Sequence, residues 1–506
     1  MSQVRKRVRW LWFLLLALSS FAIEPSASYA RAGGGESFHS SGGGGGHGGG
    51  GAIFDLLWLL FQWIQVCVSH PLIGLPVTIG VIALIYFYSR NGSTAAPVVD
   101  DELSSDEEAA AKLRAGDPAF DLAGFYGRVR LAFDRIQASW CAQNLEPVRP
   151  FISDGIHERF SIQFEEQKAF GYRDTMADIS VEEIRLVTVA VDSLFDVATL
   201  RIKATARDFR VSLANDQRIS GSTGREPFVE FWSFIRRRGA RSQPAKQGLI
   251  EGHCPNCGAP LEMNQAANCR NCHALLRSGE YDWVLTEITQ QEGWSRRRTA
   301  DPSGAEQMRQ IDPGFNCADL EDLTSVMFWR KTMADRLGKI DPLRKIAMDR
   351  FCAAYAESLK PDPDGSRVFH GDCAVGASLV LAVMTGQQIH RAIIEIFWEA
   401  SRLVARGGAL TIGDRVKGHY LFVLQRNAAA VIDPGKSVSS AHCPNCGAPM
   451  TDDLSPACQF CGTVINDGSR SWVVSELHPA SSPAAQALLR SFLSSRADIP
   501  IATAIG

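Results

Sequence analysis

The sequence predicts an α+β protein with two tandem units that follow a targeting and membrane region. Two observations predict these units. A cysteine-rich segment occurs twice, and each copy is preceded by two helical patterns and then by strand-like runs. Helices followed by strands that can pair antiparallel are typical of α+β folds. The chain has 506 residues, which is enough for about three domains.

The composition excludes two broad classes of protein. The chain carries 52 Lys and Arg against 55 Asp and Glu, a formal net charge of −3. A general nucleic-acid binder would carry a basic excess, so no nucleic-acid partner is expected. Hydrophobic residues make up 45% of the chain and charged residues 21%. These are values of a globular protein, and they exclude a wholly disordered chain.

Residues 1–30 have the pattern of an export signal. A basic start precedes an apolar run at 10–23, and residues 28–30 (Ser-Tyr-Ala) resemble a cleavage site. The apolar run is shorter than a membrane span needs, which favours a cleaved signal peptide over an uncleaved anchor. Residues 31–51 are mostly glycine and are expected to form a flexible linker.

Residues 52–90 are the most apolar part of the chain and are expected to be a membrane segment. The span is expected at 72–88, which is free of charge and ends in interfacial tyrosines. The earlier part is either an interfacial helix or a second span, broken at His70-Pro71 because proline removes a helix hydrogen bond. Residues 91–118, acidic and then alanine-rich, are expected to be a linker.

The first α+β unit is expected at 119–290. Apolar residues spaced by three and four predict a helix at 129–140 and another at 156–164, the second capped by Ser153 or Asp154. The hydrophobic period then changes to two, which predicts strands. These strands are expected at 184–191, 197–206, 228–235 and 283–288.

The second unit is expected at 315–478 and has the same order of elements. A linker at 291–314 joins it to the first unit, and a tail at 479–506 follows it. Helices are predicted at 319–339 and 342–360, and strands near 372–384, 388–404, 418–427 and from Trp472 onward.

The heptapeptide Cys-Pro-Asn-Cys-Gly-Ala-Pro occurs at 254–260 and again at 443–449, and a second Cys-x-x-Cys pair follows each copy at the same interval. Two such turns bring four thiolates to one metal in a closed tetrahedral shell, which predicts a structural Zn²⁺ in each of two ribbons, at 252–277 and 441–465. Disulfide pairs or redox-active motifs are the alternative. The eight expected ligands are Cys254, Cys257, Cys269, Cys272, Cys443, Cys446, Cys458 and Cys461.

The repeat extends beyond the cysteines. Trp283 and Glu287 recur as Trp472 and Glu476, at the same offset of 189 residues that relates the two cysteine sets. Each ribbon stands before the last strand of its unit and is therefore expected to be an insertion in the final hairpin. Reduced thiolates favour a reducing compartment. We therefore expect both units on the cytoplasmic side of the cell inner (plasma) membrane.

The first unit resembles the Tim44-like family, relatives of the membrane-docking subunit of the mitochondrial inner-membrane import motor. The resemblance lies in the helix at 133–140, in the segment 150–160, and in the strands at 228–234 and 283–288. The second unit is similar mainly in the order of its elements and in its final strand. The resemblance implies two tandem cone-shaped α+β domains of the nuclear-transport-factor-two-like type, each with a large apolar pocket. It also implies a non-catalytic role in membrane association, lipid contact and scaffolding.

The chain contains no recognisable catalytic motif, so no catalytic residue is assigned and the protein is expected not to be an enzyme. The expected function is a membrane-anchored adaptor that binds protein or lipid partners, with the ribbon tips as a contact surface. The basic triplets at 236–238 and 296–298 are either contacts for anionic lipid or solvated strand ends. The alternative function is an enzyme or a small apolar-ligand binder that uses the cone pocket, with Asp196 or Asp208 as candidate acids.

Overall fold

The computed structural model describes residues 106–191, 194–242, 247–261, 269–274, 276, 279–294, 302–431, 443–446, 448 and 455–494. All of them belong to one compact unit. The expected signal peptide at 1–30, the Gly-rich linker and the membrane segment with its span at 72–88 lie outside the described residues. Within the described ranges, no helix combines the length and apolar character that a membrane crossing requires.

The first half of this unit consists of helices followed by an antiparallel sheet. Its elements are α4 (Asp106–Gly116), α5 (Leu122–Cys141), the 3₁₀ turn η3 (Glu146–Val148), α6 (Asp154–Phe170), β1 (Tyr172–Val191), β2 (Phe195–Ser212), β3 (Arg218–Gly221), β4 (Glu226–Arg237) and β5 (Val284–Gln290). The sheet order is β1-β2-β4-β5, and the short β3 pairs with β2. Every pairing is antiparallel.

The two predicted helices of this half are confirmed. The side chains of Val129 and Phe133 on α5 are fully buried, as the apolar spacing requires. Helix α6 begins after Ser153, whose hydroxyl accepts from the backbone N–H of Ile156, so Ser153 and not Asp154 is the cap. The helix ends at Phe170, and the cap that follows it, Gly171, has a φ of 77°, in the left-handed region that glycine enters without cost.

The alternation predicted for β2 is also confirmed. Ala198, Leu200, Ile202 and Ala204 are completely buried in the core of the first half. The same core contains Phe133 of α5, whose ring centroid lies 5.3 Å from that of Trp232 on β4. One face of the sheet therefore packs against α5, because residues two apart in a strand share a face.

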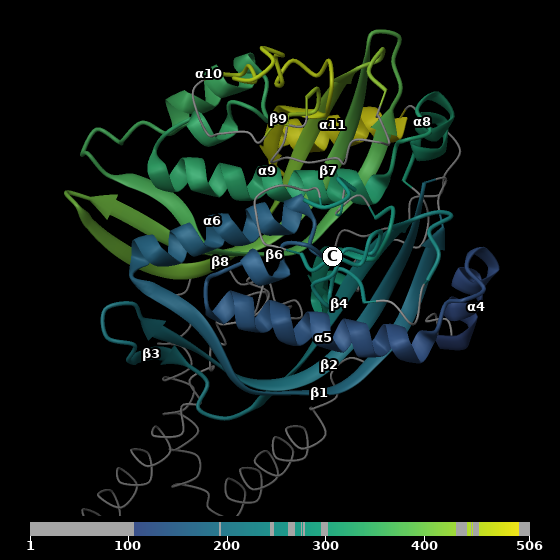
Figure 1. Cartoon of the computed structure of the whole chain (residues 1–506). Helices are drawn as coiled ribbons and strands as arrows, with labels where there is room; N and C mark the ends of the chain where they lie inside the picture. Colours follow the sequence, from purple (N-terminus) through teal and green to yellow (C-terminus); the bar gives the residue numbers. More distant parts are fainter. Residues whose placement is uncertain are drawn as a thin grey trace, which may run out of the picture. The chain divides into compact units, whose positions relative to one another are not determined.

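The second half repeats this arrangement. It contains α9 (Cys317–Leu337), the 3₁₀ turn η5 (Asp341–Leu343), α10 (Asp349–Ser358), β6 (Arg367–Met384), β7 (Ile389–Arg406), β8 (Ala409–Asn427), β9 (Val473–Pro479) and α11 (Pro483–Ser494). Its sheet has the order β6-β7-β8-β9 and is antiparallel. Figure 1 shows the two sheets as separate layers, the first in teal and the second in green to yellow.

Apart from the short β3, the strands and the two main helices of the first half have counterparts in the second. Pro147 in η3 and Pro342 in η5 are 195 residues apart, and so are the first residues of α6 and α10. A parallel bridge joins Ile152 to β5 in the first half, and a matching bridge joins Ala347 to β9 in the second. The offset falls to 189 at the ribbons. The structure thus confirms that the second half repeats the order of helices and strands of the first, and it adds the matched turns and bridges before the second helix.

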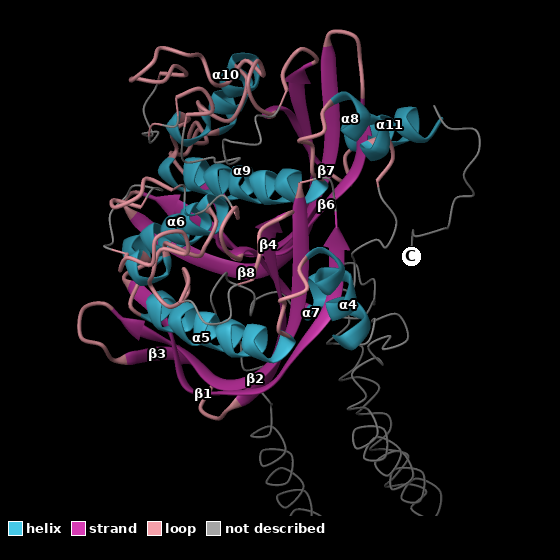
Figure 2. Ribbon diagram, turned by 45° about the vertical axis from the view of Figure 1, so that its right-hand side comes forward, coloured by secondary structure: helices cyan, strands magenta, loops and turns pink. Residues whose placement is uncertain are grey.

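Helix α6 of the first half packs against α9 of the second, and the two helices lie between the sheets (Figure 2). The side chain of Ile162 on α6 belongs to the core of the second half. Buried charged contacts surround it. Glu158 of α6 pairs with Arg330 of α9, and Glu166 of α6 accepts a hydrogen bond from the backbone N–H of Asp372 on β6.

Three segments expected as connections or tail contain ordered elements. Helix α4 lies inside the expected linker 91–118 and buries Ala109, Ala110 and Leu113. The sequence analysis did not predict this helix, because its short apolar face follows directly on acidic residues. Helices α7 (Gln291–Trp294) and α8 (Ala305–Ile311) lie inside the expected linker 291–314, and α11 lies inside the expected tail. The helix predicted at 342–360 is shorter, because η5 occupies its first turn.

Candidate metal centres and the cavity between the halves

The first four predicted ligands come together in the connection between β4 and β5. The Sγ atoms of Cys254 and Cys272 are 3.7 Å apart, and those of Cys257 and Cys269 are 3.8 Å apart. In the first turn, Cys254 accepts a backbone hydrogen bond from Gly258, which has a φ of 78°. In the second turn His273 adopts a φ of 60° in the matching position. Both turns therefore aim their thiols at one point.

The second four cysteines form the same arrangement between β8 and β9. The Sγ atoms of Cys443 and Cys461 are 3.7 Å apart, and so are those of Cys446 and Cys458. Gly462, with a φ of 69°, takes the place of His273. Both ribbons are therefore insertions in the last hairpin of each sheet, as the sequence predicted.

The spacing of the sulfur atoms fits a tetrahedral metal site. A metal bound to four thiolates at about 2.3 Å requires sulfur atoms about 3.8 Å apart, and the observed separations agree with this edge. A disulfide would require about 2.05 Å, and all eight cysteines are free. Each group can hold a metal ion, since its four sulfur atoms lie within 4.8 Å of one another. A tetrahedral set of four sulfur atoms selects zinc or iron.

Some thiols in each centre are predisposed to ionise: Cys272 in the first, and Cys458 and Cys461 in the second, have a lowered pKa. The pKa of Cys272 is lowered to about 6, first by a hydrogen bond from the backbone of Ala274. The pKa of Cys461 is lowered to about 5, first by the Thr463 hydroxyl. Burial raises the pKa of Cys254 to about 12, so metal binding there displaces a proton. Thiolates are the form that binds metal.

The two centres are attached differently to their halves. Cys254 and Cys269 belong to the main core of the first half, whereas Cys443 and Cys458 form a small cluster of their own with Ile465. The first ribbon is also fastened to α5. Arg128 of α5 pairs with Glu251 at 3.0 Å and with Asp282 at 2.6 Å, on either side of the cysteines.

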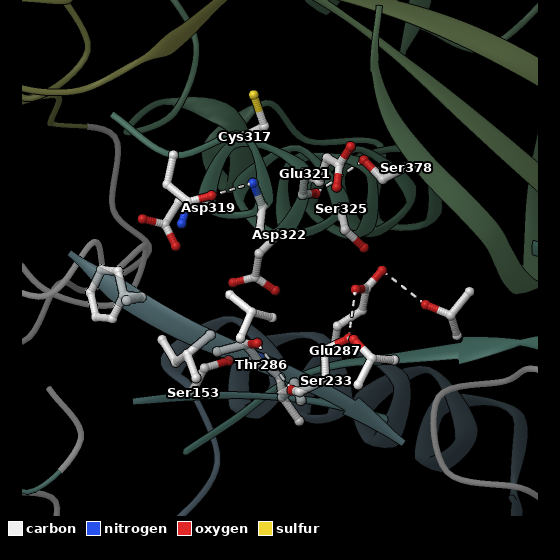
Figure 3. A pocket seen from close by; sticks show the side chains of 18 of the residues that line it. Ser153, Ser233, Thr286, Glu287, Cys317, Asp319, Glu321, Asp322, Ser325 and Ser378 are labelled. Carbon is white, nitrogen blue, oxygen red and sulfur yellow. Dashed lines mark hydrogen bonds between the residues drawn. The ribbon is translucent and has the colours of Figure 1, made fainter. Parts of the chain in front are cut away.

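A cavity of about 620 Å³ lies between the two halves. One wall is formed by α6 and the first sheet, and the other by α8, the start of α9 and β6. Figure 3 shows polar side chains from both walls, including Ser153, Ser233 and Glu287 from the first half and Asp322 and Ser378 from the second. Its volume lies within the range of small-molecule sites.

A row of polar side chains crosses the first sheet at this cavity. Thr188, Thr199, Ser233 and Glu287 are consecutive partners across β1, β2, β4 and β5, so they share one face. The hydroxyls of Thr199 and Ser233 are 2.9 Å apart and both residues are buried. The Glu287 carboxylate accepts from Thr289 at 2.8 Å and from Ser233 at 3.4 Å. The row therefore fixes the position of one carboxylate.

The opposite wall presents Asp322 from the first turns of α9. Its carboxylate pairs with Arg159 of α6 at 3.0 Å. The pKa of Asp322 is nevertheless raised to about 6, chiefly by burial, with Glu287 and Glu158 adding to it. A side chain at Gly155 would collide with this carboxylate. The absence of a side chain at Gly155 thus allows α9 to approach the start of α6.

Other residues that the sequence singled out lie elsewhere. Arg236 is neither a lipid contact nor a solvated strand end, because its side chain is 2% exposed and pairs with buried Asp117 at 2.9 Å. Asp196 lies beside the same guanidinium at 3.8 Å, and Asp208 is completely buried on β2. Neither carboxylate lines the cavity. The triplet 296–298 lies outside the described residues.

Sequence reasoning missed the buried Asp–Arg pair, although the chain carries its signal. Asp117-Pro-Ala-Phe recurs as Asp312-Pro-Gly-Phe 195 residues later. In the second half Asp312 pairs with Arg426 at 2.7 Å, and Arg426 stacks over Trp472 at 4.9 Å. Arg236 stacks over Trp283 at 4.5 Å in the same way. The cavity residues were also missed, because pairing across four strands is not visible in a sequence.

The described residues thus define a mixed α+β protein with two antiparallel sheets and two four-cysteine groups. Residues 106–245 match the model of the Tim44-like domain, so this part of the chain is a Tim44-like domain, as the sequence predicted. The match begins with α4 and ends before the first metal centre. No curated protein matches the chain. A solved "Ntf2 like protein involved in plasmid conjugation" is similar at 6% identity and a TM-score of 0.10, covering 66% of this chain and 92% of that one.

Proposed function

We propose that the protein is a non-enzymatic, membrane-associated adaptor that binds protein or lipid partners and is braced by two structural zinc ions. The match of residues 106–245 to the Tim44-like domain carries this proposal. The family resemblance implies membrane association and scaffolding. The expected membrane segment at 52–90 precedes the domain in the chain and supports the same location.

Zinc is proposed as the metal because four thiolates in a tetrahedral set suit it and close its shell. A closed shell leaves no position for water or substrate, so the role of each ion is to hold the ribbon in shape. Reduced cysteines belong to a reducing compartment. We therefore place both halves, in the nuclear-transport-factor-two-like arrangement that the family implies, on the cytoplasmic side of the inner membrane.

The ribbon tips supply an accessible surface for a partner. Phe460, between Cys458 and Cys461, is 64% exposed. An aromatic side chain in that position favours contact with another molecule, because exposed aromatics are common anchors at interfaces. At the offset of 189 residues Phe460 corresponds to Asn271 of the first ribbon, so the two tips differ in chemistry.

The experiment expresses the full chain in its native host and separates membranes from the soluble fraction. We expect the chain in the membrane pellet after a high-salt wash, with about two zinc ions per chain in the purified protein. A photo-crosslinking residue in place of Phe460 should give a discrete crosslinked species. The matched control is Ile412 on β8, which is 70% exposed and lies outside the ribbons.

A chain recovered in the soluble fraction would contradict membrane association. Crosslinks of equal pattern at positions 460 and 412 would contradict the ribbon tip as the contact surface. A purified protein with oxidised cysteine pairs and no metal would contradict both the zinc and the cytoplasmic location.

A further inference from the structure

We propose that the cavity between the two halves binds an alkylammonium group. The ligand is a free linear diamine or the lysine side chain of a partner segment. Glu287 and Asp322 are the groups that would recognise it. This inference depends neither on membrane association nor on the metal, because it rests on the geometry of the cavity alone.

Glu287 is presented to the cavity in a fixed orientation. Its carboxylate is held by the Thr289 hydroxyl at 2.8 Å and lies at the end of the row that includes Ser233 and Thr199. A carboxylate only accepts hydrogen bonds when ionised, whereas an ammonium group only donates them. A carboxylate positioned by hydroxyls is therefore a suitable receptor for an ammonium group, and such charged hydrogen bonds are stronger than neutral ones.

Asp322 faces Glu287 from the other wall, and Figure 3 shows the two carboxylates entering the space from α9 and from β5. The cavity is lined by six carboxylates and four guanidinium groups. Contacts of three of these guanidinium groups are made with other residues of the lining. Arg159 pairs with Asp322, Arg309 pairs with Glu306 at 3.1 Å, and Arg237 lies over the Phe195 ring. The lining therefore carries two more carboxylates than guanidinium groups, and this excess favours a cation over an anion.

The second half serves as an internal control for the polar row. Glu476, the match of Glu287, pairs with Val423, and Val423 pairs with Ile393. These two apolar residues occupy the places of Ser233 and Thr199, and both are completely buried. The fold therefore accepts apolar residues at this row. The hydroxyls of the first half are not required for the sheet, which indicates that they serve the cavity.

A second hydroxyl contact beside the row occurs in both halves and can be compared with the row itself. The Thr286 hydroxyl donates to the backbone carbonyl of Ser233 at 3.2 Å, and Ser475 makes the same contact to Val423 at 3.0 Å. This hydroxyl contact occurs in both halves and belongs to the sheet. The Thr199–Ser233 contact occurs only where the cavity is. The polar row is thus an addition to a common framework.

The test is isothermal titration calorimetry on the full-length, detergent-solubilised protein at low and moderate salt. The probes are 1,4-diaminobutane, spermidine, a short lysine-containing peptide and 1,4-butanediol as the neutral control. We expect binding of at least one amine probe and no binding of the diol. Glu287→Gln and Asp322→Asn should each weaken the amine at least tenfold. Glu476→Gln, the matched change in the second half, should leave affinity unchanged.

The amine probes separate the two sources. Binding of the diamine identifies a free amine as sufficient, and binding of the peptide alone identifies a side chain of a partner. Heat from no amine probe, equal binding of the diol, or equal loss in Glu476→Gln would overturn the proposal. Thermal unfolding and zinc content of each variant show whether it is folded. Membrane fractionation tests the proposed adaptor function separately. Failure of the amine-binding proposal therefore leaves the adaptor proposal intact, and the reverse also holds.

Discussion

The two halves of this protein show which parts of the fold are fixed and which are free. Both keep a buried aspartate–arginine pair against a tryptophan, Asp117 with Arg236 and Asp312 with Arg426. Both also keep the bridge from the loop before the second helix to the last strand. The halves differ in core chemistry, in the attachment of the ribbon and in the use of the second helix.

At matched positions the core of the first half is apolar, whereas the core of the second half is polar and charged. In the first half Trp140 packs against Phe160, with ring centroids 5.0 Å apart. The residues 195 positions later are Asp335 and Tyr355, and the tyrosine hydroxyl donates to the carboxylate at 2.7 Å. Lys331 pairs with the same carboxylate at 2.7 Å. An aromatic contact and a buried ionic cluster thus support the same helix.

The matched helices α6 and α10 differ in length and in the half that they contact. Helix α6 has 17 residues and carries Glu158, Ile162 and Glu166 to the other half. Helix α10, its match, has 10 residues and packs on β9 of its own half. The junction between the halves therefore depends on an extension of one helix. Changes at matched positions of the two halves test these differences.

The largest expected effect follows loss of a metal ligand. Cys257→Ser and Cys446→Ser should each remove about one metal ion per chain. Cys257→Ser should lower the free energy of unfolding by several kcal/mol, because its centre is part of the first core and structural zinc supplies folding energy on the scale of about 10 kcal/mol. Cys446→Ser should cost less, since its centre is a separate cluster. Metal analysis and thermal unfolding measure both, and equal losses of stability would contradict the different attachment of the two ribbons.

The buried ion pairs come next. Asp312→Asn should cost about 3–5 kcal/mol, because it leaves the Arg426 guanidinium buried without its carboxylate. Asp117→Asn should cost less, since Arg236 keeps Asp196 at 3.8 Å. The double change Asp312→Leu with Arg426→Met should recover much of the loss, because it removes both charges. Chemical denaturation measures the three variants, and a double variant no better than Asp312→Asn would show that the pair is needed for more than charge balance.

The junction should give a pH-dependent effect. Burial is the main cause that raises the pKa of Glu166 to about 7, so the folded state holds a proton that the unfolded chain releases near pH 4.5. Stability should therefore fall as pH rises from about 4.5 to 7. Glu166→Gln should remove about 1–3 kcal/mol of this dependence. Thermal unfolding across that range measures it. Glu357→Gln, an exposed change on α10, should leave the profile unaltered.

The smallest stability effect is expected at the polar row. Thr199→Val combined with Ser233→Ala makes the first half resemble the second, where the row is apolar. Removal of both partners of a buried hydrogen bond is nearly neutral, and Glu287 loses only the 3.4 Å contact to Ser233 while it keeps the hydrogen bond from Thr289, so the free energy of unfolding should change by about 1 kcal/mol or less. Chemical denaturation measures this. A loss of several kcal/mol would show that the row is part of the framework after all.

The sequence was sufficient for the elements whose periodicity is strong and for the metal centres, whose ligands are close in the chain. Helix α5, strand β2 and the cysteine turns follow directly from local patterns. Helix α4 was not predicted, because its three buried residues are too few to outweigh the acidic composition. The cavity could not be predicted, since it requires the packing of α6 on α9 and the register of four strands. Both are set by contacts between residues far apart in the chain.

Helix α6 also has a consequence for synthesis on the ribosome. The contact between Glu166 and the backbone of Asp372 joins residues that are 206 positions apart. At usual rates of translation, about 10 to 40 s separate the emergence of these two residues. During that interval the side of α6 that carries Ile162 has no second half to cover it. The nascent chain therefore exposes an apolar and acidic helix face at a time when other nascent segments are its nearest neighbours.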